Sequence, residues 1–241
     1  VIGEAPWATV KSANGSTFAQ YGDAAVVVLS RLGGEGSDMP RGERSLSKLD
    51  DYTGSAGDSV NGDYLKLSPK EQDLLAGLKA EKDAGTIKKI VVLLNFANQM
   101  EAAFLDDPAY GIDAALWIGT PGQTGLYAVS DILAGNVNPS GRLSATFWRT
   151  HDKNPSMATF GPTAYEGAPD AVNSDGSPQQ DKYYVVYQEG IYLGYRYTES
   201  RYEDYVMGTP NTGDYDYSAT VSYPFGYGLS YSDFTYSDFK V

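Results

Sequence analysis

Cysteine is absent from this 241-residue chain, and histidine occurs once, as His151. Without cysteine the chain can form no disulfide, zinc-thiolate site or thiol nucleophile. A single histidine also argues against a histidine-ligated metal and gives serine-histidine catalysis almost no support. The sequence therefore predicts no bound metal and no cofactor. Because His151 lies in the polar stretch 149–153, we expect it on a surface loop.

Basic side chains are also scarce: 18 lysines and arginines stand against 31 aspartates and glutamates, which gives a net charge of -13. Binding to a phosphate backbone depends on lysine and arginine displacing counterions, so we expect no nucleic-acid partner. No apolar run approaches the roughly 18 residues that suggest a membrane span, so we expect no membrane partner. With 41% hydrophobic residues, the composition predicts a soluble globular protein and leaves cytoplasmic and secreted locations both open.

The chain begins at Val1, and its first residues lack the basic and apolar regions of a signal peptide. We interpret residues 1–241 as one domain excised from a longer multidomain polypeptide. Since no internal repeat or linker divides the sequence, we expect its last third to be an extension that wraps the domain.

Three short apolar runs, at residues 24–30, 89–95 and 112–118, have the near-continuous hydrophobicity of strands that are buried on both faces. Such strands are typical of a parallel sheet. Helix patterns separate and follow them, so the sequence predicts an α/β fold, a three-layer α/β/α sandwich with a mostly parallel sheet.

The clearest helix signal is Ser68-Pro69-Lys70-Glu71, a capping box with proline at the first helical position, and the apolar periodicity after it ends at Gly85. Leu126 to Leu133 form a second amphipathic pattern, which ends at Gly135. Residues 98–107 predict a shorter helix that Pro108 would stop.

The last part of the chain holds 15 of the 20 tyrosines, all from residue 165 onward. We expect this tyrosine-rich extension to be β-rich or irregular, with a strand at 189–197 where apolar and other residues alternate. Packing between strands is the favoured role for the tyrosines, and a platform for stacking sugars is the alternative.

The connection between the first strand and the first helix, residues 31–67, is longer than the roughly 12 to 15 residues usual in compact domains. It carries Glu35 between glycines, with Asp38 close behind, just after the first strand. In open α/β folds ligands bind at the carboxyl ends of the strands. A carboxyl group there suits catalysis, although the local pattern alone also fits a solvated loop acid.

Other chemistries find little support in the motifs. The loop 119–125 follows a strand and opens a helix, but it matches neither a dinucleotide fingerprint nor a P-loop. No G-x-S-x-G nucleophile elbow occurs. Carboxylate chemistry remains, and two carboxyl groups can cleave a glycosidic bond when one protonates the leaving oxygen and the other attacks or activates water.

Six stretches in order resemble the second, α/β-sandwich domain of glycoside hydrolase family 3. They are residues 26–38, 91–95, 117–123, 132–147, 189–197 and 224–231. Each stretch is short, but together they cover most of the chain and are specific as a set.

The resemblance implies the acid/base-supplying domain of a retaining, exo-acting β-glycosidase, in particular a β-glucosidase. In such enzymes the active site lies between this sandwich and a (β/α)8-like barrel that carries the aspartate nucleophile. The loop that matches Gly34-Glu35-Gly36 supplies the general acid/base, so Glu35 is the implied catalytic residue. Arg31 and Asp38 match positions near that loop, where they would contact sugar hydroxyls or support the loop, for example as an ion pair.

The resemblance also implies the partners: a β-linked glucoside or oligosaccharide as substrate, and the barrel domain of the same parent protein. Because the barrel signature is absent from these residues, the isolated chain is expected to be inactive. Ser37 stands where an aromatic residue often follows the Glu-Gly pair, which bears on the leaving-group subsite. The alternative is a noncatalytic carbohydrate-binding or domain-packing module in which Glu35 is incidental.

Overall fold

A computed structural model describes residues 5–31, 64–159, 163–164, 172, 175–177, 183–184, 186–210, 213 and 215–240. The chain divides into two compact units. Unit 1 consists of Val1–Arg142 with Tyr227–Val241, and unit 2 of Leu143–Gly226. Each unit is described below by itself.

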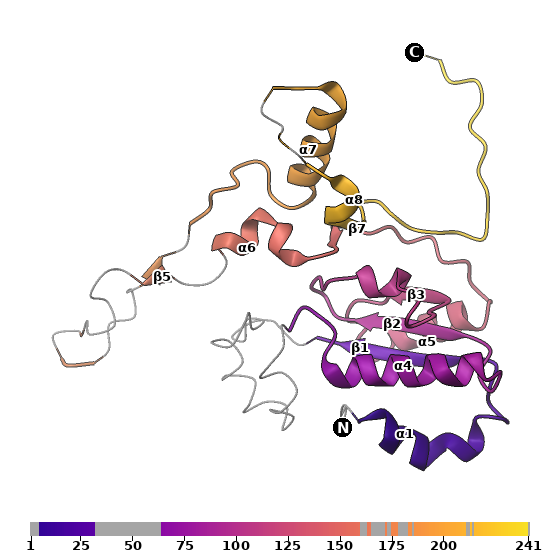
Figure 1. Cartoon of the computed structure of the whole chain (residues 1–241). Coiled ribbons are helices and arrows are strands. Elements are labelled where there is room, and N and C mark those ends of the chain that lie inside the picture. The colour runs from indigo at the N-terminus through magenta and orange to yellow at the C-terminus, as the bar shows by residue number, and fades with distance from the viewer. Residues whose placement is uncertain are drawn as a thin grey trace. The chain divides into compact units, whose positions relative to one another are not determined.

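Unit 1 contains a three-stranded parallel sheet with the order β1-β2-β3 (Figure 1). The strands are β1 (Ala25–Ser30), β2 (Ile90–Asn95) and β3 (Ala114–Trp117). All three predicted strands are thus confirmed, with small shifts at their ends. In β2, Ile90 and Val92 are fully buried, as the apolar run predicted. Burial on both faces is wrong for β1, where Val26 and Val28 are about half exposed and only one face is buried. It is also wrong for β3, none of whose residues is buried.

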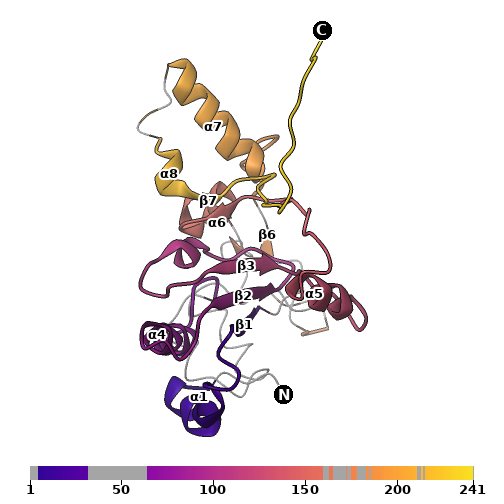
Figure 2. The ribbon, with the colours of Figure 1, turned by 90° about the vertical axis from the view of Figure 1, so that its right-hand side faces the viewer.

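Helices lie on both sides of this sheet (Figure 2). On one side is α4 (Pro69–Asp83), whose predicted capping box is present and whose Leu75 and Leu78 are buried. On the other side is α5 (Gly125–Leu133), which buries Val129. Both predicted helices are therefore confirmed.

A further helix, α1 (Trp7–Asn14), packs against α4 and is followed by the 3-10 turn η1 (Gly15–Thr17). The backbone N–H of Trp7 donates to the carboxylate of Asp73 at 2.8 Å. The indole ring occupies the space where a Cβ on Gly77 would lie, so a glycine is required at that position of α4. This close approach fixes where α1 crosses α4.

The predicted helix at 98–107 is wrong in extent, because only η2 (Ala103–Asp106), a 3-10 helix, forms there. The side-chain amide of Asn98 donates to the carbonyl of Gln99 at 2.7 Å. The N–H of Glu101 donates to the carbonyl of Leu65 at 2.8 Å. These bonds hold the backbone in a non-helical path beside residues 64–67.

Unit 2 is built from short elements. In chain order they are β4 (Phe147–Trp148), η3 (His151–Lys153), α6 (Pro155–Thr159), β5 (Thr163–Ala164), β6 (Tyr183–Tyr184), α7 (Tyr195–Met207), α8 (Tyr217–Thr220) and β7 (Val221–Tyr223). Strand β4 pairs antiparallel with β7, and β5 pairs antiparallel with β6. In the described part of the chain no helix is both long and apolar enough to cross a membrane.

The predicted strand at 189–197 is wrong. Gly190 and Gly194 adopt φ values of 57° and 61°, a left-handed conformation that turns the chain and that glycine adopts at little cost. Helix α7 then begins at Tyr195 and ends at Met207, where Gly208, also with a positive φ, caps it. The two glycines therefore break the alternation that had suggested a strand.

The tyrosines of unit 2 pack on one another locally. Tyr197 meets Tyr215 edge to face with ring centroids 6.5 Å apart, and Tyr202 contacts Tyr217 at 4.7 Å. Aromatic packing is thus present, but it joins α7 to residues 215–217 and not one strand to another.

His151 is buried, with 5% of its surface exposed, so its predicted place on a surface loop is wrong. It opens η3, a single tight turn in which the side chain of the next residue, Asp152, is 65% exposed. The turn directs the imidazole inward while its polar neighbours remain in solvent.

Candidate functional site

The carboxyl end of β1 is where the sequence places its candidate site residues, and Arg31 is the first residue beyond that strand. The Arg31 side chain is only 4% exposed. Its Nε donates to the carbonyl of Tyr64 at 2.6 Å, and Nη2 donates to the carbonyl of Lys66 at 2.6 Å. Nη1 donates to the carbonyl of Ser30 at 2.8 Å. Arg31 thus joins the two ends of the connection formed by residues 32–63.

Glu71 is the charged partner of Arg31. Nη1 and Nη2 of Arg31 each donate to one carboxylate oxygen of Glu71 at 2.7 Å, in a bidentate pair. The Glu71 side chain is 7% exposed. Charge-assisted bidentate pairs of this kind are strong and geometrically specific, and a buried charge needs such a partner.

Glu71 also belongs to the capping box of α4. Its Oε2 accepts from the N–H of Ser68 at 2.8 Å, while the Ser68 hydroxyl accepts from the N–H of Glu71 at 3.2 Å. The same carboxylate therefore locks the start of α4 to the exit of β1. We call Arg31, Ser68 and Glu71 the clamp.

The guanidinium of Arg31 has five N–H donors, and the bonds described above use all five. Its plane also lies against the ring of Tyr64, 5.5 Å from the centroid. The geometry favours loop support over contact with sugar hydroxyls, because each donor already has an acceptor within the protein.

The other two predicted site residues, Glu35 and Asp38, lie outside the described residues. The expected ion pair of Arg31 with Asp38 therefore stays a prediction, and the structure instead describes an ion pair of Arg31 with Glu71, which was not predicted. Sequence reasoning used Glu71 only as a capping residue. The missed signal was an arginine directly after a buried strand, since such a cation is rarely buried without a carboxylate.

Trp117 closes β3 at the same end of the sheet. Its indole N–H donates to the carbonyl of the fully buried Phe96 at 2.6 Å. Past β3, Gly119 and Gly122 adopt positive φ values and turn the chain into α5, where Thr124 makes no side-chain cap. This rim is held by packing and turns.

The amino end of the sheet has its own charged group, Asp113. Burial by itself would raise the pKa of Asp113, but hydrogen bonds from Lys82, the backbone N–H of Ile90 and Lys89 lower it to about 2. The Lys82 ammonium lies 2.6 Å from the carboxylate. This network lies at the amino end of the sheet, away from the clamp. Its hydrogen bonds stabilise that end of the sheet.

Within the part of the chain that the structure describes, no group of three or more acidic or histidine side chains is placed to hold a metal ion.

Comparison with known proteins identifies the family. Residues 9–195 match the model of the glycosyl hydrolase family 3 C-terminal domain. The chain is 30% identical over 234 residues to β-glucosidase A of Butyrivibrio fibrisolvens, which covers 92% of this chain and 23% of that protein. It is 37% identical over 121 residues to β-glucosidase B of Emericella nidulans, covering 50% of this chain and 12% of the relative.

A solved structure gives the same answer. A β-glucosidase from Paenibacillus barengoltzii superposes with a TM-score of 0.58 and 25% identity, covering 90% of this chain and 18% of that one. The chain thus spans less than a quarter of the length of these relatives. In parent enzymes of this family the C-terminal domain pairs with an N-terminal barrel domain. This chain belongs to the glycosyl hydrolase family 3 C-terminal domain family.

Proposed function

We propose that this chain supplies the general acid/base to a retaining, exo-acting β-glucosidase that hydrolyses O-glycosidic bonds. Glu35 is the acid/base. The nucleophile comes from a (β/α)8-like barrel domain of the same parent protein, and the substrate is a β-linked glucoside or oligosaccharide. Similarity to proteins named β-glucosidases supports the substrate class.

The clamp is the observation that carries this proposal. It fixes both ends of the connection that contains Glu35 at the carboxyl end of β1. Glu35 is four residues beyond Arg31 in the sequence. Since ligands in α/β folds bind at the carboxyl ends of the strands, this position in the sequence supports the proposed role.

The chemistry needs a carboxyl group that changes role. As an acid, Glu35 protonates the oxygen of the leaving group while the barrel nucleophile attacks the sugar. As a base, it then deprotonates the water that hydrolyses the glycosyl-enzyme. An acid that works near neutral pH needs a raised pKa, which a neighbouring negative charge and exclusion of water provide in such enzymes.

Arg31 and Asp38 have supporting roles in this proposal. Arg31 holds the base of the connection, since its donors are engaged within the protein. Asp38 orients the loop or contacts sugar hydroxyls.

The domain in the parent enzyme is a three-layer α/β/α sandwich with a tyrosine-rich C-terminal extension. Helices α4 and α5 on opposite sides of the parallel sheet support this arrangement (Figure 2). Val26 and Val28 in β1 are 48% and 50% exposed, and apolar side chains in such a strand are normally covered by a further layer.

Glu35→Gln in the parent enzyme tests the catalytic role. We expect kcat to fall about 10²- to 10⁴-fold on substrates with poor leaving groups, because these need protonation. Activated nitrophenyl glucosides should lose much less, and azide should restore turnover of Glu35→Ala by attacking the glycosyl-enzyme.

Glu43→Gln, in the same connection, is the matched control and should leave both rates unchanged. If both classes of substrate keep their wild-type rates in Glu35→Gln, Glu35 is not the acid/base and the noncatalytic module remains. The isolated 241-residue chain should not turn over nitrophenyl glucosides, because its nucleophile is missing.

A further inference from the structure

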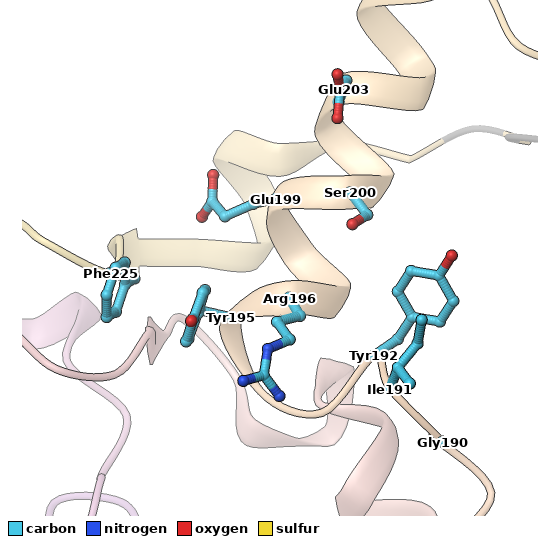
Figure 3. Close-up of a pocket in the computed structure, with 9 residues that line it drawn as sticks. All are labelled: Gly190, Ile191, Tyr192, Tyr195, Arg196, Glu199, Ser200, Glu203 and Phe225. Atoms are coloured by element: carbon cyan, nitrogen blue, oxygen red, sulfur yellow. The ribbon is translucent and has the colours of Figure 1, made fainter.

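Unit 2 carries an open groove along α7, with a cavity volume of about 810 Å³ (Figure 3). This volume lies in the range of roughly 300 to 1,000 Å³ that is usual for sites of small molecules. Its lining consists of Gly190, Ile191, Tyr192, Tyr195, Arg196, Glu199, Ser200, Glu203 and Phe225. All of these residues belong to unit 2.

Aromatic rings stand on both sides of the groove. Tyr195 and Phe225 stack with centroids 4.0 Å apart and planes 13° apart, and Tyr192 lies on the opposite side of α7 (Figure 3). Phe225 is 45% and Tyr192 is 49% exposed. The groove therefore presents partly exposed aromatic rings to solvent, and covering them is favourable.

Charged side chains run between these rings. Arg196, Glu199 and Glu203 are spaced three and four residues apart on α7, so they lie along one face of the helix. The Arg196 guanidinium lies 5.7 Å from the centroid of the Tyr195 ring. This cation–π contact reduces the freedom of the side chain before any ligand arrives.

The carboxylate of Glu199 is oriented as well. The hydroxyl of Tyr217, on α8, donates to Glu199 Oε1 at 2.7 Å. A fixed acceptor and a fixed donor thus face the groove together with aromatic rings.

The balance of charge selects the ligand. Two carboxylates disfavour an anion, while Arg196 disfavours a cation. A neutral ligand with hydroxyl groups suits both kinds of side chain, because a hydroxyl accepts a hydrogen bond from a guanidinium and donates one to a carboxylate. The carbon faces of a sugar ring are apolar and can cover a tyrosine or phenylalanine ring.

We propose that this groove is a binding site for a neutral oligosaccharide, in which Tyr192 and the Tyr195–Phe225 pair contact sugar rings and Arg196 and Glu203 bind hydroxyls. The site would hold a glucan on unit 2. It requires no chemistry from Glu35.

Hydrogen-exchange mass spectrometry of the parent protein tests this proposal with thio-linked cellotetraose, a tetramer that glycosidases do not cleave. We expect slower exchange in peptides covering residues 190–203. In Tyr192→Ala, about five times more tetramer should be needed for the same protection, which is the size of effect expected for one aromatic contact. Arg196→Met should weaken it as well.

Tyr205→Ala is the matched control, because Tyr205 lies on the same helix, is 56% exposed and does not line the groove. It should leave the protection unchanged. Unchanged exchange at 190–203 with up to about 10 mM tetramer would overturn the proposal, as would stronger protection by trigalacturonate, an anionic sugar.

The readout does not depend on turnover. If Glu35→Gln loses activity but the groove is not protected, only the groove proposal fails. If the groove is protected but Glu35→Gln keeps wild-type activity, only the catalytic proposal fails.

Discussion

The two units of this chain are stabilised in different ways. In unit 1 the buried hydrophobic side chains are mostly aliphatic and come from β1, β2, α4 and the segment after β2. In the described part of unit 2 the buried hydrophobic residues are Phe147, Trp148, Met157 and Val221. Unit 2 instead packs aromatic rings of α7 against Tyr215 and Tyr217.

Their buried polar groups differ too. Among the residues that the structure describes, the charged pair Arg31 and Glu71 is buried in unit 1, whereas unit 2 buries His151, Thr146, Thr198 and Thr220. The buried polar side chains described in unit 1 thus form one ion pair, while most of those described in unit 2 carry hydroxyl groups. The difference shows that an aliphatic layered core tolerates a buried charge only with a complete set of partners.

The largest effect should follow from breaking the ion pair. Glu71→Ala leaves the Arg31 charge buried without its carboxylate, and removing one partner of a buried pair costs about 3–5 kcal/mol. It also removes half of the capping box. Urea unfolding followed by hydrogen exchange of β1 and β2 should report this loss in unit 1, with unit 2 little changed.

The control for this variant is Asp83→Ala on the same helix. Asp83 pairs with Lys79 at 2.6 Å but is 64% exposed, so its loss should cost no more than about 0.5 kcal/mol. Equal losses for the two variants would show that the clamp contributes no more than a surface ion pair.

A smaller effect is expected from the buried hydroxyls of unit 2. Thr198→Val removes the hydroxyl that donates to the carbonyl of Tyr195 and lies 3.4 Å from the Thr146 hydroxyl, which leaves polar groups without a partner and costs about 2 kcal/mol. Adding Thr146→Val should recover part of this loss. Thermal unfolding of Thr198→Val, Thr146→Val and the double variant measures these losses. Strictly additive losses would exclude coupling between the threonines.

The smallest expected effect is a difference between the units in how their stability depends on pH. The pKa of Asp113 in unit 1 is lowered to about 2, so its contribution is present above about pH 4 and lost as the pH falls toward 2. In unit 2 burial raises the pKa of Tyr215 to about 12, so its contribution is present below about pH 10 and lost as the pH rises toward 12. Because both groups are partly exposed, each change should be about 1 kcal/mol.

Hydrogen exchange of each unit across the two pH windows measures these losses. Asp113→Asn should flatten the acid window of unit 1 alone, and Tyr215→Phe the alkaline window of unit 2 alone. If Asp113→Asn altered the pH dependence of unit 2, or Tyr215→Phe that of unit 1, the assignment of the two pH windows to these residues would be contradicted.

Sequence patterns predicted unit 1 well because its elements follow aliphatic periodicity. The runs at 24–30, 89–95 and 112–118 became strands, and the capping box placed the start of α4 at Pro69. In these segments local propensity and burial favour the same structure.

The predictions failed where tertiary contacts decide the conformation. Alternating residues at 189–197 suggested a strand, but left-handed Gly190 and Gly194 turn the chain into a helix. His151 lies in a polar stretch and is nevertheless buried, because one tight turn sets its direction.

The candidate site was predicted only in part. The ion pair of Arg31 with Glu71 was not predicted, because the two residues are 40 apart in the chain, a separation that no local pattern reveals. The roles of Glu35 and Asp38 stay predictions that follow from the family resemblance.

The clamp has a consequence for how this chain would tolerate insertions. Since one guanidinium ties the exit of β1 to the carbonyls of Tyr64 and Lys66, the chain is held together on both sides of the connection by the clamp itself. Doubling the length of a flexible loop costs only about 0.6 kcal/mol in closure entropy. We therefore expect residues inserted between Arg31 and Tyr64 to leave the stability of the sheet nearly unchanged.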